Sequence, residues 1–139
     1  MKKKTNKYKK IAIIGLGYVG LPLALSFSKY FKVVGFDINF FRIKELKSAY
    51  DRTDEFKKLE LKKFDNIVYS SKEEDIVDSD FFIITVPTPV DKSNKPNLKP
   101  IIQSSKTVAK YLKKDSTVIY ESTVYPGLTE EICVPIIEK

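Results

Sequence analysis

The stretch IAIIGLGYVG, residues 11–20, decides the fold of this chain. Its first four residues are apolar and predict a short buried strand, and an apolar helical pattern begins directly after the glycines. Gly15 allows a tight turn, Gly17 lets the backbone approach a pyrophosphate, and Gly20 lets helix and strand pack closely. Because the helix N-terminus also offers free N–H groups and a positive dipole, we interpret the stretch as a dinucleotide-binding turn rather than a plain glycine turn.

Further apolar runs recur along the chain and alternate with helical patterns. The runs are continuous rather than alternating, as expected for parallel strands covered on both faces. Strand and helix alternation then predicts an α/β fold with a doubly wound parallel sheet (Rossmann), strand order 3-2-1-4-5, over residues 11–139. We expect the cofactor to cross the switch point between the first and fourth strands. The runs are 11–14, 33–36, 67–69, 81–86 and 117–120, with amphipathic helices at 40–46 and 98–112.

The remaining segments give weaker predictions. Ser71 and Glu74 have the spacing of a capping box that would open a short acidic helix. Residues 47–64 are dense in charge and predict a loose connection, and residues 91–100 predict a polar loop. The segment from Pro126 onward predicts a helix that Pro135 kinks or ends.

Composition excludes several classes of function. The chain has 139 residues, no histidine, one cysteine and a formal net charge of +7. The absence of histidine rules out a His-based zinc site and a Ser-His-Asp triad, and one cysteine cannot form an internal disulfide. The lysines form a basic leader at 1–10 and are otherwise scattered, so we expect solubility charge and no nucleic-acid partner.

Residues 11–28 carry no charge and follow the leader, which is also the outline of a secretory signal or a membrane span. Three glycines and Pro22 interrupt the run, and no small-residue cleavage site stands out. We therefore expect a cytoplasmic protein without a membrane partner.

Asp37 ends the second predicted strand, about twenty residues beyond the glycines. A carboxylate there accepts hydrogen bonds from both adenosine ribose hydroxyls and repels a 2′-phosphate, which favours NAD over NADP. Arg42 leaves two interpretations open, because it is either a cation that welcomes that phosphate or a solvated helix residue.

Two more stretches lie at strand ends, where open α/β sheets bind ligands. In VPTPVD, residues 86–91, prolines stiffen the loop and the Thr88 hydroxyl is placed to bond a ribose or phosphate; an ordinary proline turn is the alternative. In ESTVYPG, residues 121–127, hydroxyls would face the nicotinamide end, although Thr123 could equally cap a helix.

Together these stretches resemble the N-terminal domain of the UDP-glucose/GDP-mannose dehydrogenase family. YESTVYPGLTEE, residues 120–131, is most similar to the UDP-N-acetylhexosamine 6-dehydrogenases of the Vi polysaccharide type. The resemblance implies an NAD-dependent, four-electron oxidation of the sugar C6 alcohol to a carboxylate, for bacterial surface polysaccharide. It rests on GLGYVGLPLA at 15–24, GFDIN at 35–39 with Arg42, VPTPVD at 86–91 and ESTVYPG at 121–127.

The resemblance also implies roles for single residues. Thr88 would contact the cofactor, and Thr123 would support catalysis by reaching the nicotinamide and the catalytic water or substrate oxygen. Gly15, Tyr18, Val19 and Gly20 would line the pyrophosphate, while Asp37 and Arg42 would hold the adenosine end.

The family's catalytic cysteine, lysine, asparagine and aspartate lie beyond residue 139, and Cys133 matches none of them. We expect Cys133 to be a packed core residue. The chain is therefore expected to be the front part of a longer enzyme, inactive alone, whose downstream portion holds the nucleotide sugar and the homodimer contacts.

Three other functions remain as alternatives. A stand-alone NAD-binding redox regulator explains the glycines and Asp37 but not VPTPVD or ESTVYPG. A β-hydroxyacid dehydrogenase shares the first two elements. An RNA-binding domain would rest on the charge alone.

Overall fold

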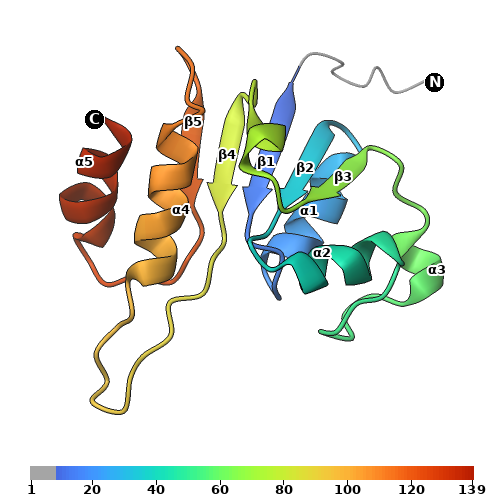
Figure 1. The fold of residues 1–139 in the computed structure, drawn as a ribbon, viewed down its shortest axis with the longest axis horizontal. Helices are drawn as coiled ribbons and strands as arrows, with labels where there is room; N and C mark the ends of the chain where they lie inside the picture. The colour runs from blue at the N-terminus through green and yellow to red at the C-terminus, as the bar shows by residue number, and fades with distance from the viewer. Residues whose placement is uncertain (1–8) are drawn as a thin grey trace.

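A five-stranded parallel sheet forms the centre of the protein in a computed structural model that describes residues 9–139. The strand order β3-β2-β1-β4-β5 confirms the predicted topology (Figure 1). Most of the basic leader expected at 1–10 lies outside the described residues. The strands are β1 (Lys10–Ile14), β2 (Lys32–Phe36), β3 (Ile67–Ser70), β4 (Phe81–Ile84) and β5 (Thr117–Tyr120).

Helices connect successive strands. The two predicted amphipathic helices are present, and α1 follows the glycine turn. The elements are α1 (Gly20–Ser28), α2 (Phe40–Lys47), α3 (Lys58–Leu61), the 3₁₀ helix η1 (Glu73–Ile76), α4 (Lys99–Ala109), the π-helical turn η2 (Thr129–Cys133) and α5 (Val134–Ile137).

Three local predictions need correction. The segment 47–64 is not wholly loose, because it contains the one-turn helix α3. The capping box at Ser71 does not form: η1 starts after Lys72, no side chain caps it among the described residues, and the Lys72 N–H donates to the Ser70 hydroxyl instead. Pro135 does not end the last helical segment: it lies in the first turn of α5, which follows directly on the π-helical turn η2, so the type of helical turn changes beside the proline.

The sheet is covered on both faces, as a doubly wound fold requires. Alternate residues of each strand point to opposite sides. Ile13 packs on the face that α1 and α2 cover, together with Leu21 and Leu46. Ile14 packs on the face that α4 and η1 cover, together with Val108 and Ile76. Leu46 is 3% exposed, and the other five residues are at most 2% exposed.

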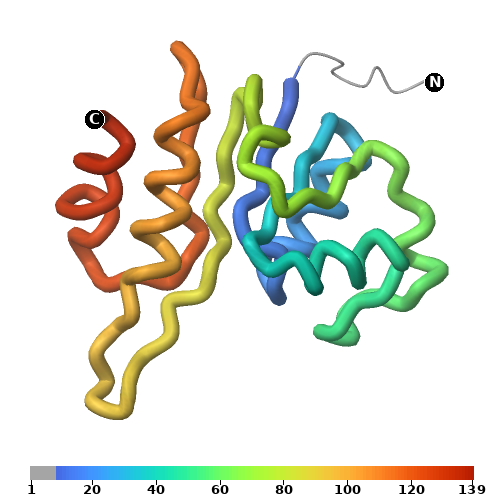
Figure 2. The backbone as a smooth tube through the Cα atoms, in the orientation of Figure 1, coloured from blue at the N-terminus to red at the C-terminus, as the bar shows by residue number. Residues whose placement is uncertain are grey.

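Strand register brings the carboxyl ends of the central strands level with one another. Ile14 at the end of β1 pairs with Phe36 of β2 on one side and with Ile84 of β4 on the other. The glycine loop and the segments after β2 and β4 therefore leave the sheet at the same edge. From there the chain between β4 and α4 reaches well away from the sheet before it returns (Figure 2).

No helix within residues 9–139 is both long and apolar enough to cross a membrane.

Candidate functional site

A pocket of about 600 Å³ lies at the carboxyl edge of the sheet. It crosses the switch point between β1 and β4, where the sequence placed the cofactor. Eight of the nine predicted site residues contribute to its wall. On one side these are Gly15, Gly17, Tyr18, Val19, Asp37 and Arg42, and on the other Thr88 and Thr123.

The glycine loop forms the floor of the pocket. Gly15 has a φ of +97°, a conformation that favours glycine, and its N–H donates to the Phe36 carbonyl at 2.8 Å. A Cβ at Gly17 would meet no atom of the described residues within 4 Å, so the backbone is open to a ligand there. Within the described part of the chain no side chain caps α1, whose N-terminus follows directly. Free N–H groups and the helix dipole thus fit a pyrophosphate.

Gly20 is the ninth residue, and it lies behind the pocket wall. It is buried, and a Cβ there would come within 1.8 Å of the Gly15 carbonyl oxygen and 2.5 Å of Thr85 Oγ1. Thr85 Oγ1 in turn donates to the same Gly15 oxygen at 2.7 Å. Gly20 therefore allows α1 to pack closely on the sheet, as its spacing predicted, and it does not line the pocket. Sequence analysis missed Thr85, which a hydroxyl inside the apolar run 81–86 could have signalled.

Asp37 is held by the backbone on both carboxylate oxygens. Its Oδ2 accepts from the Leu16 N–H at 2.9 Å and its Oδ1 from the Asn39 N–H at 2.9 Å. Each ionised oxygen keeps a further lone pair for a ribose hydroxyl. Asn39 is the N-cap of α2 and accepts from the Arg42 N–H, so the turn after β2 is fixed at both ends. The arrangement fits the adenosine ribose expected at Asp37.

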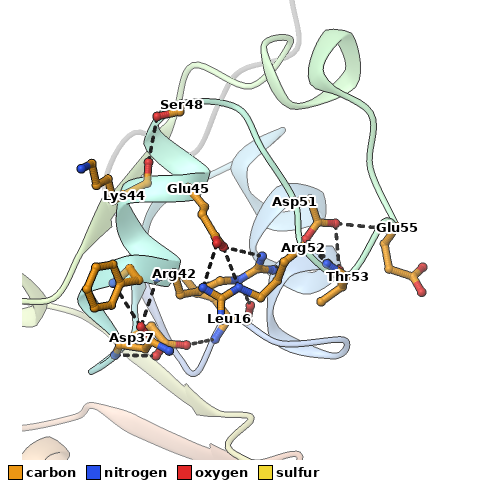
Figure 3. A network of polar contacts seen from close by, with 12 residues as sticks. Leu16, Asp37, Arg42, Lys44, Glu45, Ser48, Asp51, Arg52, Thr53 and Glu55 are labelled. Atoms are coloured by element: carbon orange, nitrogen blue, oxygen red, sulfur yellow. Dashed lines mark hydrogen bonds and ion pairs between the residues drawn. The ribbon is translucent and has the colours of Figure 1, made fainter.

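Arg42 is buried, and its interpretation as a solvated helix residue is wrong. Only 4% of the residue is exposed. Its Nε donates to the Leu16 carbonyl at 2.8 Å, and its Nη2 lies 2.9 Å from Asp51 Oδ1 (Figure 3). The guanidinium thereby joins the glycine loop to the segment after α2. It is part of the pocket wall, and its Nε hydrogen bond and its ion pair with Asp51 point into the protein, while its Nη1 has no hydrogen-bond partner among the described residues.

Asp51 completes this network, and sequence analysis missed it. Its side chain is fully buried and accepts hydrogen bonds from the N–H groups of Thr53, Glu55 and Phe56 and from the Thr53 hydroxyl. Burial acts to raise the pKa of Asp51, but hydrogen bonds from Thr53 and Arg42 outweigh it and hold the pKa below its ordinary value. Asp51 therefore stays charged and balances Arg42. A lone Asp in a charge-dense segment gave no signal of this.

Arg52 and Thr53 also line the pocket, at the end where the adenosine is expected, and neither was predicted. The Arg52 side chain is 43% exposed and forms a bidentate pair with Glu45, at 2.7 Å and 2.8 Å. Figure 3 shows Glu45 on α2 facing both arginines, with Asp37 at the other end of the group.

The other side of the pocket comes from the loops after β4 and β5. The Thr88 hydroxyl donates to the Thr123 carbonyl, and the Ser122 hydroxyl donates to the Val86 carbonyl at 2.7 Å. These bonds tie the two predicted stretches together. Thr123 caps no helix, since the N-cap of η2 is Leu128 and within residues 9–139 no side chain caps that turn. The Thr123 residue itself is exposed.

Cys133 is fully buried in a small cluster between α4 and η2, which confirms the prediction of a core residue. A thiol in that position reaches no ligand. Nothing else in this chain is a thiol, so no cysteine lines the pocket.

The profile of the UDP-glucose/GDP-mannose dehydrogenase family, NAD binding domain, matches residues 9–139. The chain belongs to this family. Protein CapL of Staphylococcus aureus is 57% identical over 131 residues, which are 94% of this chain and 31% of that protein. The UDP-N-acetyl-D-glucosamine 6-dehydrogenase of Pseudomonas aeruginosa is 51% identical over 130 residues, with the same two coverages of 94% and 31%.

A solved structure shows the same fold. The UDP-D-ManNAc dehydrogenase from Pyrococcus horikoshii superposes with a TM-score of 0.80 at 31% identity, over 94% of this chain and 33% of that one. The chain thus spans about a third of the length of these relatives. Its fold, its family and its NAD cofactor agree with the predictions from sequence. Two of the three relatives named here are dehydrogenases by name, and none supports a redox regulator. The family match also displaces the β-hydroxyacid dehydrogenase and RNA-binding alternatives.

Proposed function

We propose that this chain is the NAD-binding part of an enzyme that oxidises the C6 alcohol of a UDP-N-acetylhexosamine, UDP-N-acetylglucosamine or UDP-N-acetylgalactosamine, to the uronic acid. One observation carries the proposal: a single pocket joins the glycine loop and Asp37 to the VPTPVD and ESTVYPG loops. A relative that is 51% identical over 130 residues is named UDP-N-acetyl-D-glucosamine 6-dehydrogenase. The product, a UDP-linked uronic acid, is a precursor suited to surface polysaccharide.

Different residues of the pocket bind different parts of the cofactor. The N–H groups around Gly15, Gly17, Tyr18 and Val19 hold the pyrophosphate, and Asp37 accepts the adenosine ribose hydroxyls. Thr88 acts through the Thr123 carbonyl and sets the position of the loop after β5. Thr123 then offers its hydroxyl to the nicotinamide end and to the oxygen of water or substrate.

Oxidation of an alcohol to a carboxylate removes two hydrides and consumes one water, so each sugar reduces two NAD. When bound, NAD supplies the hydride acceptor. This chain's own part is to orient the cofactor and to present Thr123 at the open end of the pocket. Sugar binding, covalent chemistry and homodimer contacts belong to the longer enzyme, which we place in the cytoplasm, with no nucleic-acid or membrane partner.

Titration calorimetry on the 139-residue chain tests the cofactor part. We expect saturable binding of NAD and no NADH formation with either UDP-sugar, because Cys133 is buried and no other thiol is present. The protein as encoded by its gene should form two NADH for each UDP-sugar consumed. A folded chain that binds no NAD would refute the proposed cofactor site. NADH formed by the 139-residue chain alone would refute the proposal that the covalent chemistry belongs to the longer enzyme.

A further inference from the structure

Two arginines face the adenosine end of the pocket, and their surroundings differ. Arg42 has a side chain that is 5% exposed and is engaged by Leu16 and Asp51. Arg52 is 43% exposed and lies on the solvent side of the same wall. A 2′-phosphate on the adenosine ribose could recruit the exposed guanidinium of Arg52. The Arg42 guanidinium is buried and ion-paired to Asp51 at 2.9 Å, although its Nη1 has no hydrogen-bond partner among the described residues. Arg52 is therefore the cation that matters for the choice between NAD and NADP.

The Glu45 carboxylate pairs with the Arg52 guanidinium. Both carboxylate oxygens of Glu45 accept from the Arg52 guanidinium, in the fork geometry that makes arginine pairs specific. The hydrogen bond from Arg52 lowers the pKa of Glu45, and the same bond raises the pKa of Arg52, so the pair is fully charged at neutral pH. The Glu45 carboxylate also lies 4.0 Å from Arg42 Nη1, which places one negative charge between two positive ones.

We propose that Glu45 is a specificity-determining residue, which excludes NADP by holding the Arg52 guanidinium that would otherwise bind a 2′-phosphate. Asp37 repels that phosphate from the end of β2, and Glu45 removes the compensating cation from the opposite side. The two carboxylates act on different steps, because Asp37 adds repulsion while Glu45 withholds attraction. NAD carries no 2′-phosphate, so the Glu45 and Arg52 pair leaves its binding unchanged.

The test compares NAD and NADP binding to the 139-residue chain by titration calorimetry. Glu45→Gln removes the charge and keeps the shape, which frees Arg52. We expect the Kd of NADP to fall about tenfold, the factor that one net charge-assisted hydrogen bond supplies, while the Kd of NAD stays within about twofold. The gain should shrink at high salt, because the new contact is exposed. Glu45→Gln combined with Arg52→Gln should lose it entirely.

Asp80 and Lys113 provide the matched control. Their side chains are 25% and 42% exposed, against 26% and 43% for Glu45 and Arg52, and their Nζ to Oδ1 distance is 3.1 Å. The pair lies at the opposite edge of the sheet, before β4 begins. Asp80→Asn should change the affinity for neither dinucleotide.

Should Asp37 alone keep NADP binding of the wild type too weak to measure, the comparison moves to the Asp37→Asn background. There the addition of Glu45→Gln should tighten NADP about tenfold. An unchanged Kd of NADP in a folded Glu45→Gln chain would overturn the proposal, and so would an equal gain for NAD and NADP, which would mean a general charge effect. Circular dichroism on each variant establishes that it is folded.

Discussion

The two halves of the pocket are built differently. The adenosine half comes from one continuous stretch, from β1 to the segment after α2, and a buried arginine with a fully buried carboxylate ties it together. The nicotinamide half comes from two separate loops, after β4 and β5, held to each other by the hydroxyls of Thr88 and Ser122. Thr123 in this half is exposed, whereas Arg42 and Asp51 are buried.

This difference indicates which half is complete within the chain. The adenosine half ties its own loops together, through the Arg42 contacts with Leu16 and Asp51. The nicotinamide half leaves Thr123 exposed, on the side where the proposed function puts the substrate. A domain that binds the cofactor firmly at one end and leaves the reacting end open suits an enzyme whose substrate is held by other residues. Variants that damage one half and spare the other test this contrast.

The largest effect is expected from Gly20→Ala, which damages both halves at once. The new Cβ would lie 1.8 Å from the Gly15 oxygen and 2.5 Å from Thr85 Oγ1, so α1 must move off β1 and β4. We expect a loss of more than about 3 kcal/mol in the free energy of unfolding, measured by urea denaturation.

Gly17→Ala is the matched control for Gly20→Ala. Its Cβ would meet no described atom within 4 Å, so the free energy of unfolding should change little. NAD binding should weaken nonetheless, because the methyl group occupies the space that the pyrophosphate needs. Equal stabilities of the two alanine variants would show that the packing role assigned to Gly20 is mistaken.

Arg42→Met is expected to rank second and to damage the adenosine half alone. It leaves the buried Asp51 carboxylate without its cation and the Leu16 carbonyl without its donor, at a cost of about 3 kcal/mol. NAD should bind more weakly, since the glycine loop loses a support. Arg42→Lys should recover only part of the stability, because an ammonium cannot reach both partners in the same fixed fork. Full recovery by lysine would contradict the positioning role.

How far the sequence predicted this site depends on the range of each interaction. The glycine turn, Asp37 and the strand order follow from local patterns and topology, and all were predictable. The partnership of Arg42 with Asp51 was not, because it joins a helix to a loop whose course no periodicity describes. Arg42 on a charged helix had no visible reason to be buried, and the reason is a fully buried Asp51 whose own support comes from the backbone N–H groups of Glu55 and Phe56. Whether two charged residues pair across a loop depends on how that loop packs, and no pattern in the sequence shows this packing.

Thr88→Val should affect the nicotinamide half alone. It removes the hydrogen bond to the Thr123 carbonyl in a partly exposed loop, so we expect a loss of about 1 kcal/mol or less in the free energy of unfolding. The affinity for NAD should fall because the loop after β5 is no longer held in place, while the affinity for ADP should not change. Calorimetry with both ligands separates the halves, and an equal loss for ADP would show that the two halves are coupled.

The smallest expected effect is the loss of free energy of unfolding at acid pH. The pKa of Asp51 is lowered in the folded protein, so the unfolded chain binds its proton first as the pH falls. The stability that Asp51 contributes is complete above its unfolded pKa of about 3.9 and is lost as the pH falls toward the folded value. Urea denaturation should thus give a constant free energy of unfolding from about pH 7 to 5 and a decline below about pH 4. Asp51→Asn should start from a lower stability and decline less steeply, and an unchanged slope would place the acid sensitivity in other carboxylates, such as Glu45, Glu73 and Asp80, whose pKa values are also lowered.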